Sequence, residues 1–249
     1  MGGLFALLYG VASYVVFFAS FLYAIVFVGD IGNVGGLAIP KTIDSGTSDA
    51  PIVSALIDAL LLSVFAIQHS VMARPAFKRA WTRVVPQSVE RSTYVLLASL
   101  ALVLIYWQWR PLPDAVWTVT SPLAALVLAI LFWAGWGLVL VSTFLLNHFE
   151  LFGLRQVWAR MRGEAVPAAQ FRTPGFYRYV RHPIYFGFIV AFWSTPVMSV
   201  GHLLFAVATT GYIFIGIFLE ERDLVAYFGE TYIAYRKRVW MILPLPPSR

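Results

Sequence analysis

Two groups of polar residues lie in the apolar C-terminal part of this 249-residue chain, and their types could bind a small zwitterion. The first group is Arg181 and His182, followed by Pro183 where an apolar helix can begin. Proline suits the first helical position, and the free N–H groups of a helix start, with a neighbouring arginine, attract a carboxylate or phosphate. The second group is Glu220 and Glu221, whose carboxylates can accept hydrogen bonds from an ammonium group or from hydroxyls.

The apolar sequence between these groups is long enough to return them to one side of a membrane. Roughly 35 residues separate them, which allows two short spans of ~17 residues each. A path out and back ends on the face where it began. The sequence therefore predicts that Arg181, His182 and the two glutamates meet at one membrane interface.

Other polar residues beside apolar segments are costly to bury, and each of them suggests a function. Asp58 and His69 are three helical turns apart, so both could face one cavity. A plainer interpretation is that Asp58 is hydrated at a membrane boundary and that His69 ends its helix. His148, beside Asn147 at the end of another apolar segment, could act on a substrate or hydrogen-bond the terminal carbonyls.

Several kinds of site are disfavoured by what the sequence lacks. There is no H-x-x-x-H or H-E-x-x-H spacing, so we expect no metal centre. The chain has no cysteine, which excludes disulfides and thiolate ligands. Glycine-rich nucleotide signatures are also absent, so a nucleotide-like cofactor would need a helical site in the membrane.

The composition is that of an integral membrane protein. Apolar residues make up 60% of the chain and the mean hydropathy is +0.77, whereas soluble domains average about 45–50% apolar residues. Apolar runs long enough to span a bilayer fall at residues 4–28, 52–72, 92–109, 122–146, 184–200 and 203–219. We therefore predict a single all-α membrane domain of five to six transmembrane helices. Residues 1–146 would form a four-helix part, and residues 147–249 would form the part with the ligand site.

The formal charge of +6 is explained by where the basic residues lie rather than by nucleic-acid binding. Nearly all of them occupy residues 74–91, 147–182 and the C-terminal tail, while the alternate loops carry only Lys41 and Arg110. The positive-inside rule then predicts that both termini and the two polar groups face the cytoplasm. Trp107, Trp109 and Trp117 would lie in the aromatic belt of the outer boundary.

The tail contains a second basic element at residues 235–238, YRKR. Its simplest interpretation is a juxtamembrane patch that contacts anionic membrane lipid. Because Tyr232 and Tyr235 are three residues apart, an alternative is an aromatic helix face beside the ligand. We favour lipid contact.

Both halves of the chain resemble known membrane proteins. The C-terminal signature of the isoprenylcysteine carboxyl methyltransferase and phospholipid methyltransferase superfamily is matched by RHPIYFG (residues 181–187), EExxL (220–224), FGxxYxxY (228–235) and the segment from Val239 to Pro244. The NnrU-like branch is matched by QHS (68–70), MARP (72–75), ERSTY (90–94) and WQWRP (107–111). Together they are most similar to the bacterial membrane-bound methanethiol S-methyltransferases, which implies a bacterial inner membrane.

The resemblance implies a set of roles. S-adenosylmethionine would be held on the cytoplasmic side by residues of two motifs. The first motif supplies Arg181, His182, Pro183, Tyr185 and Gly187, and the second supplies Glu220 and Glu221. The acceptor would be methanethiol, and the product dimethyl sulfide. His69 is the first candidate for the base that deprotonates the thiol, and His148 the second. The alternatives are an isoprenylcysteine carboxylate or lipid acceptor, or a non-enzymatic NnrU-like membrane protein.

Overall fold

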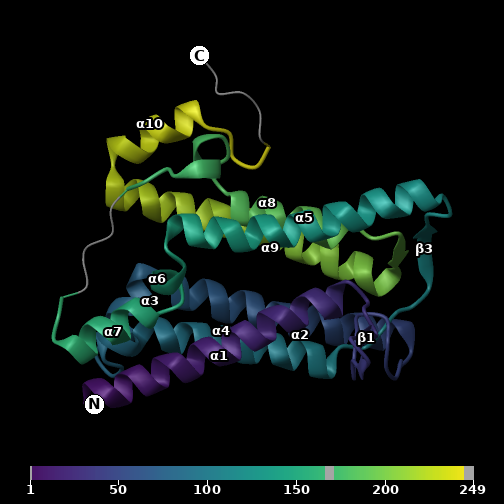
Figure 1. Ribbon diagram of the computed structural model, residues 1–249, viewed down its shortest axis with the longest axis horizontal. Coiled ribbons are helices and arrows are strands. Elements are labelled where there is room, and N and C mark those ends of the chain that lie inside the picture. The colour runs from purple at the N-terminus through teal and green to yellow at the C-terminus, as the bar shows by residue number, and fades with distance from the viewer. Residues whose placement is uncertain (1, 166–170, 244–249) are drawn as a thin grey trace.

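The computed structural model describes residues 2–165 and 171–243 as two layers of long helices (Figure 1). One layer holds α1, α2 and α4, and the other holds α5, α8 and α9. The helices are α1 (Gly3–Val28), α2 (Pro51–Ala73), α3 (Pro75–Trp81), α4 (Gln87–Gln108), α5 (Pro122–Leu146), α6 (His148–Leu151), α7 (Leu154–Arg162), the 3-10 helix η1 (Gly175–Arg178), α8 (Pro183–Trp193), α9 (Val200–Phe228) and α10 (Glu230–Arg238). The strands form two antiparallel pairs, β1 (Asn33–Val34) with β2 (Leu37–Ala38) and β3 (Ala115–Thr118) with β4 (Val197–Ser199).

The predicted all-α membrane bundle is confirmed. Five helices, α1, α2, α4, α5 and α9, are long and apolar enough to cross a bilayer, and α8 is a shorter apolar helix. Many large apolar side chains on the long helices are exposed. In a bilayer, where helices satisfy their own backbone hydrogen bonds, those exposed side chains would contact lipid tails.

The two predicted short spans at 184–200 and 203–219 are wrong in their lengths. α8 ends at Trp193, three residues before Pro196, because proline disfavours helix in the residue that precedes it. α9 begins at Val200, where the Ser199 side chain caps it by accepting from the backbone N–H of His202, and it continues to Phe228. The glutamates therefore lie inside a 29-residue helix rather than at its end.

Close backbone contact joins α5 to α8. A Cβ atom at Gly135 would lie 2.7 Å from the carbonyl oxygen of Gly187, and one at Gly187 would lie 2.7 Å from that of Gly135. Small residues at such crossings let membrane helices approach each other. In space, α5 therefore belongs with the C-terminal helices, although its sequence falls in the part grouped above as residues 1–146.

The two ends of the bundle differ. The end that holds α3, α7 and α10, named here the charged end, also carries the start of α1 and most of the basic loops (Figure 1). The opposite end, named the hairpin end, carries β1 and β3. Trp109 lies at this end, as predicted, but it is completely buried and its indole N–H donates to the carbonyl of Ile43, so it contacts protein rather than lipid headgroups. Pro244 of the C-terminal signature lies outside the described residues.

Candidate functional site

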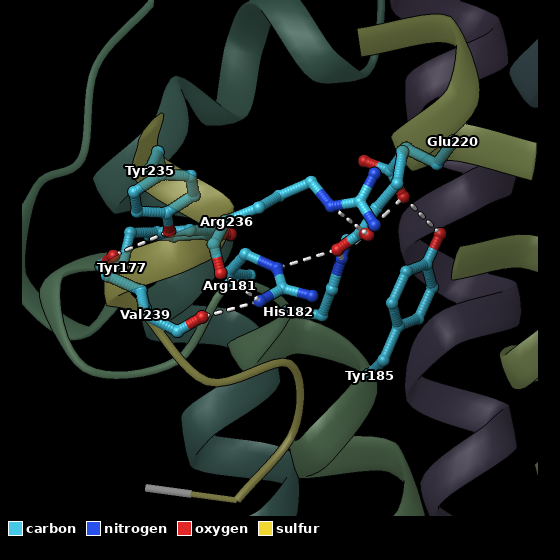
Figure 2. Close-up of polar contacts among 9 residues, drawn as sticks. Tyr177, Arg181, His182, Tyr185, Glu220, Tyr235, Arg236 and Val239 are labelled. Carbon is cyan, nitrogen blue, oxygen red and sulfur yellow. Dashed lines mark hydrogen bonds and ion pairs between the residues drawn. The ribbon is translucent and has the colours of Figure 1, made fainter. Parts of the chain in front are cut away.

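The start of α8 meets α9 at the charged end, and this junction brings the two predicted polar groups together (Figure 2). Arg181 Nε donates to Glu221 Oε1 at 2.7 Å, and His182 Nε2 donates to the same oxygen at 3.0 Å. Figure 2 also shows Arg236 of α10, whose Nε lies 3.2 Å from Glu221 Oε2. Both oxygens of Glu221 are thus paired, and we name Arg181, His182, Glu221 and Arg236 the closed cluster.

Backbone from the C-terminal segment holds the closed cluster in place. Arg181 Nη1 donates to the carbonyl of Val239 at 2.5 Å and to that of Arg236 at 3.2 Å. The backbone N–H groups of Arg181 and His182 donate to the carbonyls of Trp240 and Met241, at 2.8 and 3.2 Å. The guanidinium of Arg181 is therefore used to fasten α8, α9 and the segment after α10 to one another.

A buried hydroxyl fastens α10 to η1. Burial raises the pKa of Tyr235 to about 12, so its hydroxyl stays protonated and donates to the carbonyl of Tyr177 at 2.6 Å. The side chains of Tyr232 and Tyr235 also surround the ring of Phe171. Tyr232 and Tyr235 thus form an aromatic helix face that packs against protein.

Glu220 differs from its neighbour. The hydroxyl of Tyr185 donates to its Oε2 at 2.9 Å, and His182 Nδ1 lies 3.9 Å from the same oxygen (Figure 2). Its side chain is 42% exposed, against 8% for Glu221. A carboxylate can accept about four hydrogen bonds. Glu220 therefore keeps the capacity to accept further donors, and we name Glu220 and Tyr185 the open pair.

A second polar group faces the open pair from the other layer of helices. The hydroxyl of Tyr94 in α4 lies 2.8 Å from Nε2 of His69 in α2, and the ring of Phe65 stacks on that of His69. The ring of His69 also lies 6.4 Å from that of Tyr212, which is about two helical turns before Glu220 on α9. His69 and Glu220 thus belong to one region between α2, α4, α8 and α9.

His148 lies in a different environment. Thr143 gives its hydroxyl proton to the carbonyl of Leu140, so its oxygen accepts from Nδ1 of His148 at 2.8 Å. The other ring nitrogen, Nε2, then accepts from the hydroxyl of Tyr14 at 2.8 Å. Burial lowers the pKa of His148, which keeps the ring neutral at pH 7. Both ring nitrogens have partners within the protein, which favours a structural over a catalytic interpretation of His148.

Three further predicted residues take structural positions. Pro183 is at the start of α8, as expected, and is buried. Gly187 faces α5 through the close crossing described above, and two residues along a helix place it about 200° from Tyr185, away from the open pair. Asp58 does not share a cavity with His69, because its Oδ1 accepts from the backbone N–H of Arg110 at the hairpin end.

Sequence reasoning missed Arg236 and Tyr94. Arg236 was grouped with the lipid-facing run at residues 235–238, but Gly229, at φ 57°, ends α9 and turns α10 back over Glu221. Tyr94 lies in a motif noted only for its resemblance, ERSTY, and no spacing in the sequence links it to His69. Across residues 2–165 and 171–243, no three His, Asp or Glu side chains form a group that could hold a metal ion.

Comparison with known proteins identifies relatives along almost the whole chain. A family model described as "Protein of unknown function (DUF1295)" matches residues 80–239. The chain is 55% identical over 239 residues to methanethiol S-methyltransferase 1 of Bradyrhizobium diazoefficiens, which covers 96% of this chain and 82% of that protein. It is 54% identical over 241 residues to methanethiol S-methyltransferase of Mycobacterium tuberculosis, which covers 96% of each.

A more distant relative is Nurim of Mus musculus, which is 30% identical over 178 residues, covering 67% of this chain and 66% of that protein. No solved structure matches the chain. The resemblance found in the motifs at residues 181–187 and 220–235 is confirmed over a much longer stretch. By these matches, the chain belongs to the methanethiol S-methyltransferase family.

Proposed function

We propose that this protein transfers a methyl group from S-adenosylmethionine to methanethiol and so forms dimethyl sulfide. Relatives at 55% and 54% identity carry the name methanethiol S-methyltransferase. The observation that carries the proposal is the pairing of the closed cluster with the open pair at one helix junction. This pairing offers opposite charges side by side.

The charges of the junction fit the methionine end of S-adenosylmethionine, which has a carboxylate and an ammonium group. In the closed cluster, the guanidiniums of Arg181 and Arg236 face the single carboxylate of Glu221, so the two arginines carry one more charge than Glu221 balances. The open pair adds the negative charge of Glu220, whose side chain is partly exposed. Arg236, whose side chain is 45% exposed, would hold the carboxylate, and Glu220 would accept from the ammonium group or from ribose hydroxyls.

When bound, S-adenosylmethionine supplies a methyl group on a sulfonium: the thiolate sulfur forms the new carbon–sulfur bond as the sulfonium bond breaks. Tyr185 fixes the rotamer of Glu220 through its 2.9 Å hydrogen bond. Its aromatic ring can also attract a nearby cation. The closed cluster holds α8 against α9, so that the two ends of the ligand meet groups in fixed positions.

The acceptor side would use His69. A small thiol is mostly protonated at neutral pH, since the thiol of cysteine has a pKa of about 8.5. In the described part of the chain, the His69 ring has one polar partner, the Tyr94 hydroxyl, which lies 2.8 Å from Nε2 and 3.1 Å from Nδ1. One hydroxyl can donate to only one of these nitrogens, so the ring keeps the capacity to take the thiol proton. Tyr94 would orient the ring, and the rings of Phe65 and Tyr212 would exclude water from the transfer.

The same proposal includes an orientation. The charged end, with α3, α7 and α10, would face the cytoplasm of a bacterial cell, and the protein would lie in the inner membrane with both termini inside. The donor would then reach the open pair from the cytoplasm, and the apolar thiol would enter through the bilayer.

A direct assay tests the proposed reaction. The purified protein in detergent would be incubated with methyl-labelled S-adenosylmethionine and methanethiol, and labelled dimethyl sulfide would be measured in the headspace. We expect transfer to methanethiol and little to prenylcysteine. Binding of the donor without any dimethyl sulfide would reject methanethiol as the acceptor, whereas absence of donor binding would reject the proposed site itself.

A further inference from the structure

A groove outside the proposed active site has the chemistry of a phospholipid site. It has a volume of about 360 Å³ and is lined by Val141, Leu145, Gly175, Phe176, Arg178 and Tyr179. One wall is the last two turns of α5, a helix apolar enough to cross the membrane, and the other is η1. We propose that this groove binds an anionic phospholipid, with an acyl chain along α5 and the phosphate at Arg178.

The position of the groove is suited to an acyl chain. Val141 is 47% exposed on a membrane-spanning helix, so in a bilayer its surroundings are lipid tails. Phe176 and Tyr179 are also exposed, and they stand where α5 ends. Aromatic residues at such a boundary are typical of the headgroup level of a membrane. The groove thus runs from tail depth to headgroup depth.

The charge of Arg178 is suited to an anionic headgroup. Its side chain is exposed, and within residues 2–165 and 171–243 it has no carboxylate in ion-pair distance. A guanidinium binds a phosphate with two parallel hydrogen bonds. An uncompensated arginine at the mouth of an apolar groove therefore selects an anionic headgroup.

A second groove at the same end provides an internal comparison. It is lined by Leu7, Val11, Asn147, Phe149, Leu154, Arg155 and Trp158, and its volume is about 550 Å³. Its arginine, Arg155, donates to Glu150 Oε2 at 2.5 Å and is therefore already neutralised. Apolar lining and a boundary position are common to both grooves. Only the first groove has a cation available for a phosphate, so only the first should distinguish headgroups.

The test uses the full-length protein in phosphatidylcholine nanodiscs with a minority of phosphatidylglycerol. The lipids that stay bound would be counted by native mass spectrometry. We expect enrichment of phosphatidylglycerol, which Arg178→Gln would reduce about fivefold, the factor that corresponds to about 1 kcal/mol per basic residue at a membrane surface. Arg178→Lys should keep most of the enrichment. Arg83→Gln, which removes another exposed arginine of the charged end, should leave it unchanged.

A photoreactive phosphatidylglycerol with a diazirine near the chain end would locate the acyl chain. Labelling should concentrate on residues 141–145 and fall when Leu145→Trp fills the groove. Three results would each overturn the proposal. They are unchanged enrichment of phosphatidylglycerol in Arg178→Gln, an equal loss of that enrichment in Arg83→Gln, and labelling centred on Phe149 and Trp158. Because these readouts are binding measurements, they stand independently of methyltransferase activity.

Discussion

Glu220 and Glu221 are adjacent in sequence, yet they serve two different regions of the molecule. Glu221 points into the closed cluster, where two arginines and a histidine occupy both of its oxygens. Glu220 is 42% exposed, and only its Oε2 has described partners, the Tyr185 hydroxyl at 2.9 Å and His182 Nδ1 at 3.9 Å. Two adjacent glutamates can therefore have different roles: one joins helices, and the other keeps the capacity to bind a ligand.

The two candidate histidines differ in the same way. His148 is buried and its two ring nitrogens have two different partners, while His69 has a single described polar partner, the Tyr94 hydroxyl. If this division holds, changes in the saturated groups should affect stability first. Changes in the open groups should affect binding or turnover in a protein that is still folded.

The largest effect is expected for Glu221→Gln. Removing one partner of a buried ion pair costs about 3–5 kcal/mol, because the other charges stay buried without compensation. The thermal unfolding midpoint, followed by tryptophan fluorescence in detergent, should fall sharply and donor binding should be lost. Glu164→Gln is the matched control, since its ion pair with Arg162 is exposed on both sides and should contribute little. Equal midpoints for the two variants would contradict the closed cluster.

The next effect is expected for His69→Ala. Loss of a general base typically lowers turnover by about 10²–10⁴-fold. Affinity for S-adenosylmethionine, measured by calorimetry, should stay the same, because the proposed donor groups lie on α8, α9 and α10. Tyr94→Phe should have a smaller effect on turnover and should alter its pH profile. Full turnover in His69→Ala would remove this histidine from the mechanism.

Glu220→Gln should weaken donor binding without unfolding the protein. A hydrogen bond to a charged group contributes about 1.5–3 kcal/mol, so the dissociation constant should rise at least about tenfold. The thermal midpoint without ligand should hardly change, because the carboxylate is partly exposed. A large drop in the midpoint with unchanged affinity would reverse the roles assigned to the two glutamates.

The smallest effect concerns pH and His148. Since burial lowers its pKa in the folded state, the unfolded chain binds a proton more readily. The stability it contributes is fully present above about pH 6.5, the ordinary value for histidine, and declines as the pH falls below that value. The midpoint should drop by a few degrees on acidification, and less so in His148→Gln. An identical decline in both proteins would show that other groups cause it.

Much of this architecture follows from the sequence because membranes restrict the possibilities. Apolar runs predict the long helices, and an even number of crossings predicts that Arg181 meets the glutamates. The end of α8 was mispredicted because the apolar run was bounded by hydrophobicity alone. Pro196 lies within that run, and proline disfavours helix in the residue before it. The sequence could not distinguish Glu220 from Glu221, because which neighbour each meets depends on how α8 and α10 pack around α9. The contact between Tyr94 and His69 likewise depends on packing between helices.

The parallel bridge between Val180 and Trp240 places the segment that follows α10 beside the start of α8. Arg181 and His182 are synthesised before residues 239–241, whose carbonyls accept hydrogen bonds from them. During synthesis, the membrane helices can therefore insert while the ligand site is still incomplete. A protein truncated before Val239 would keep its spans and lose its site, so correct insertion alone would not report an active enzyme.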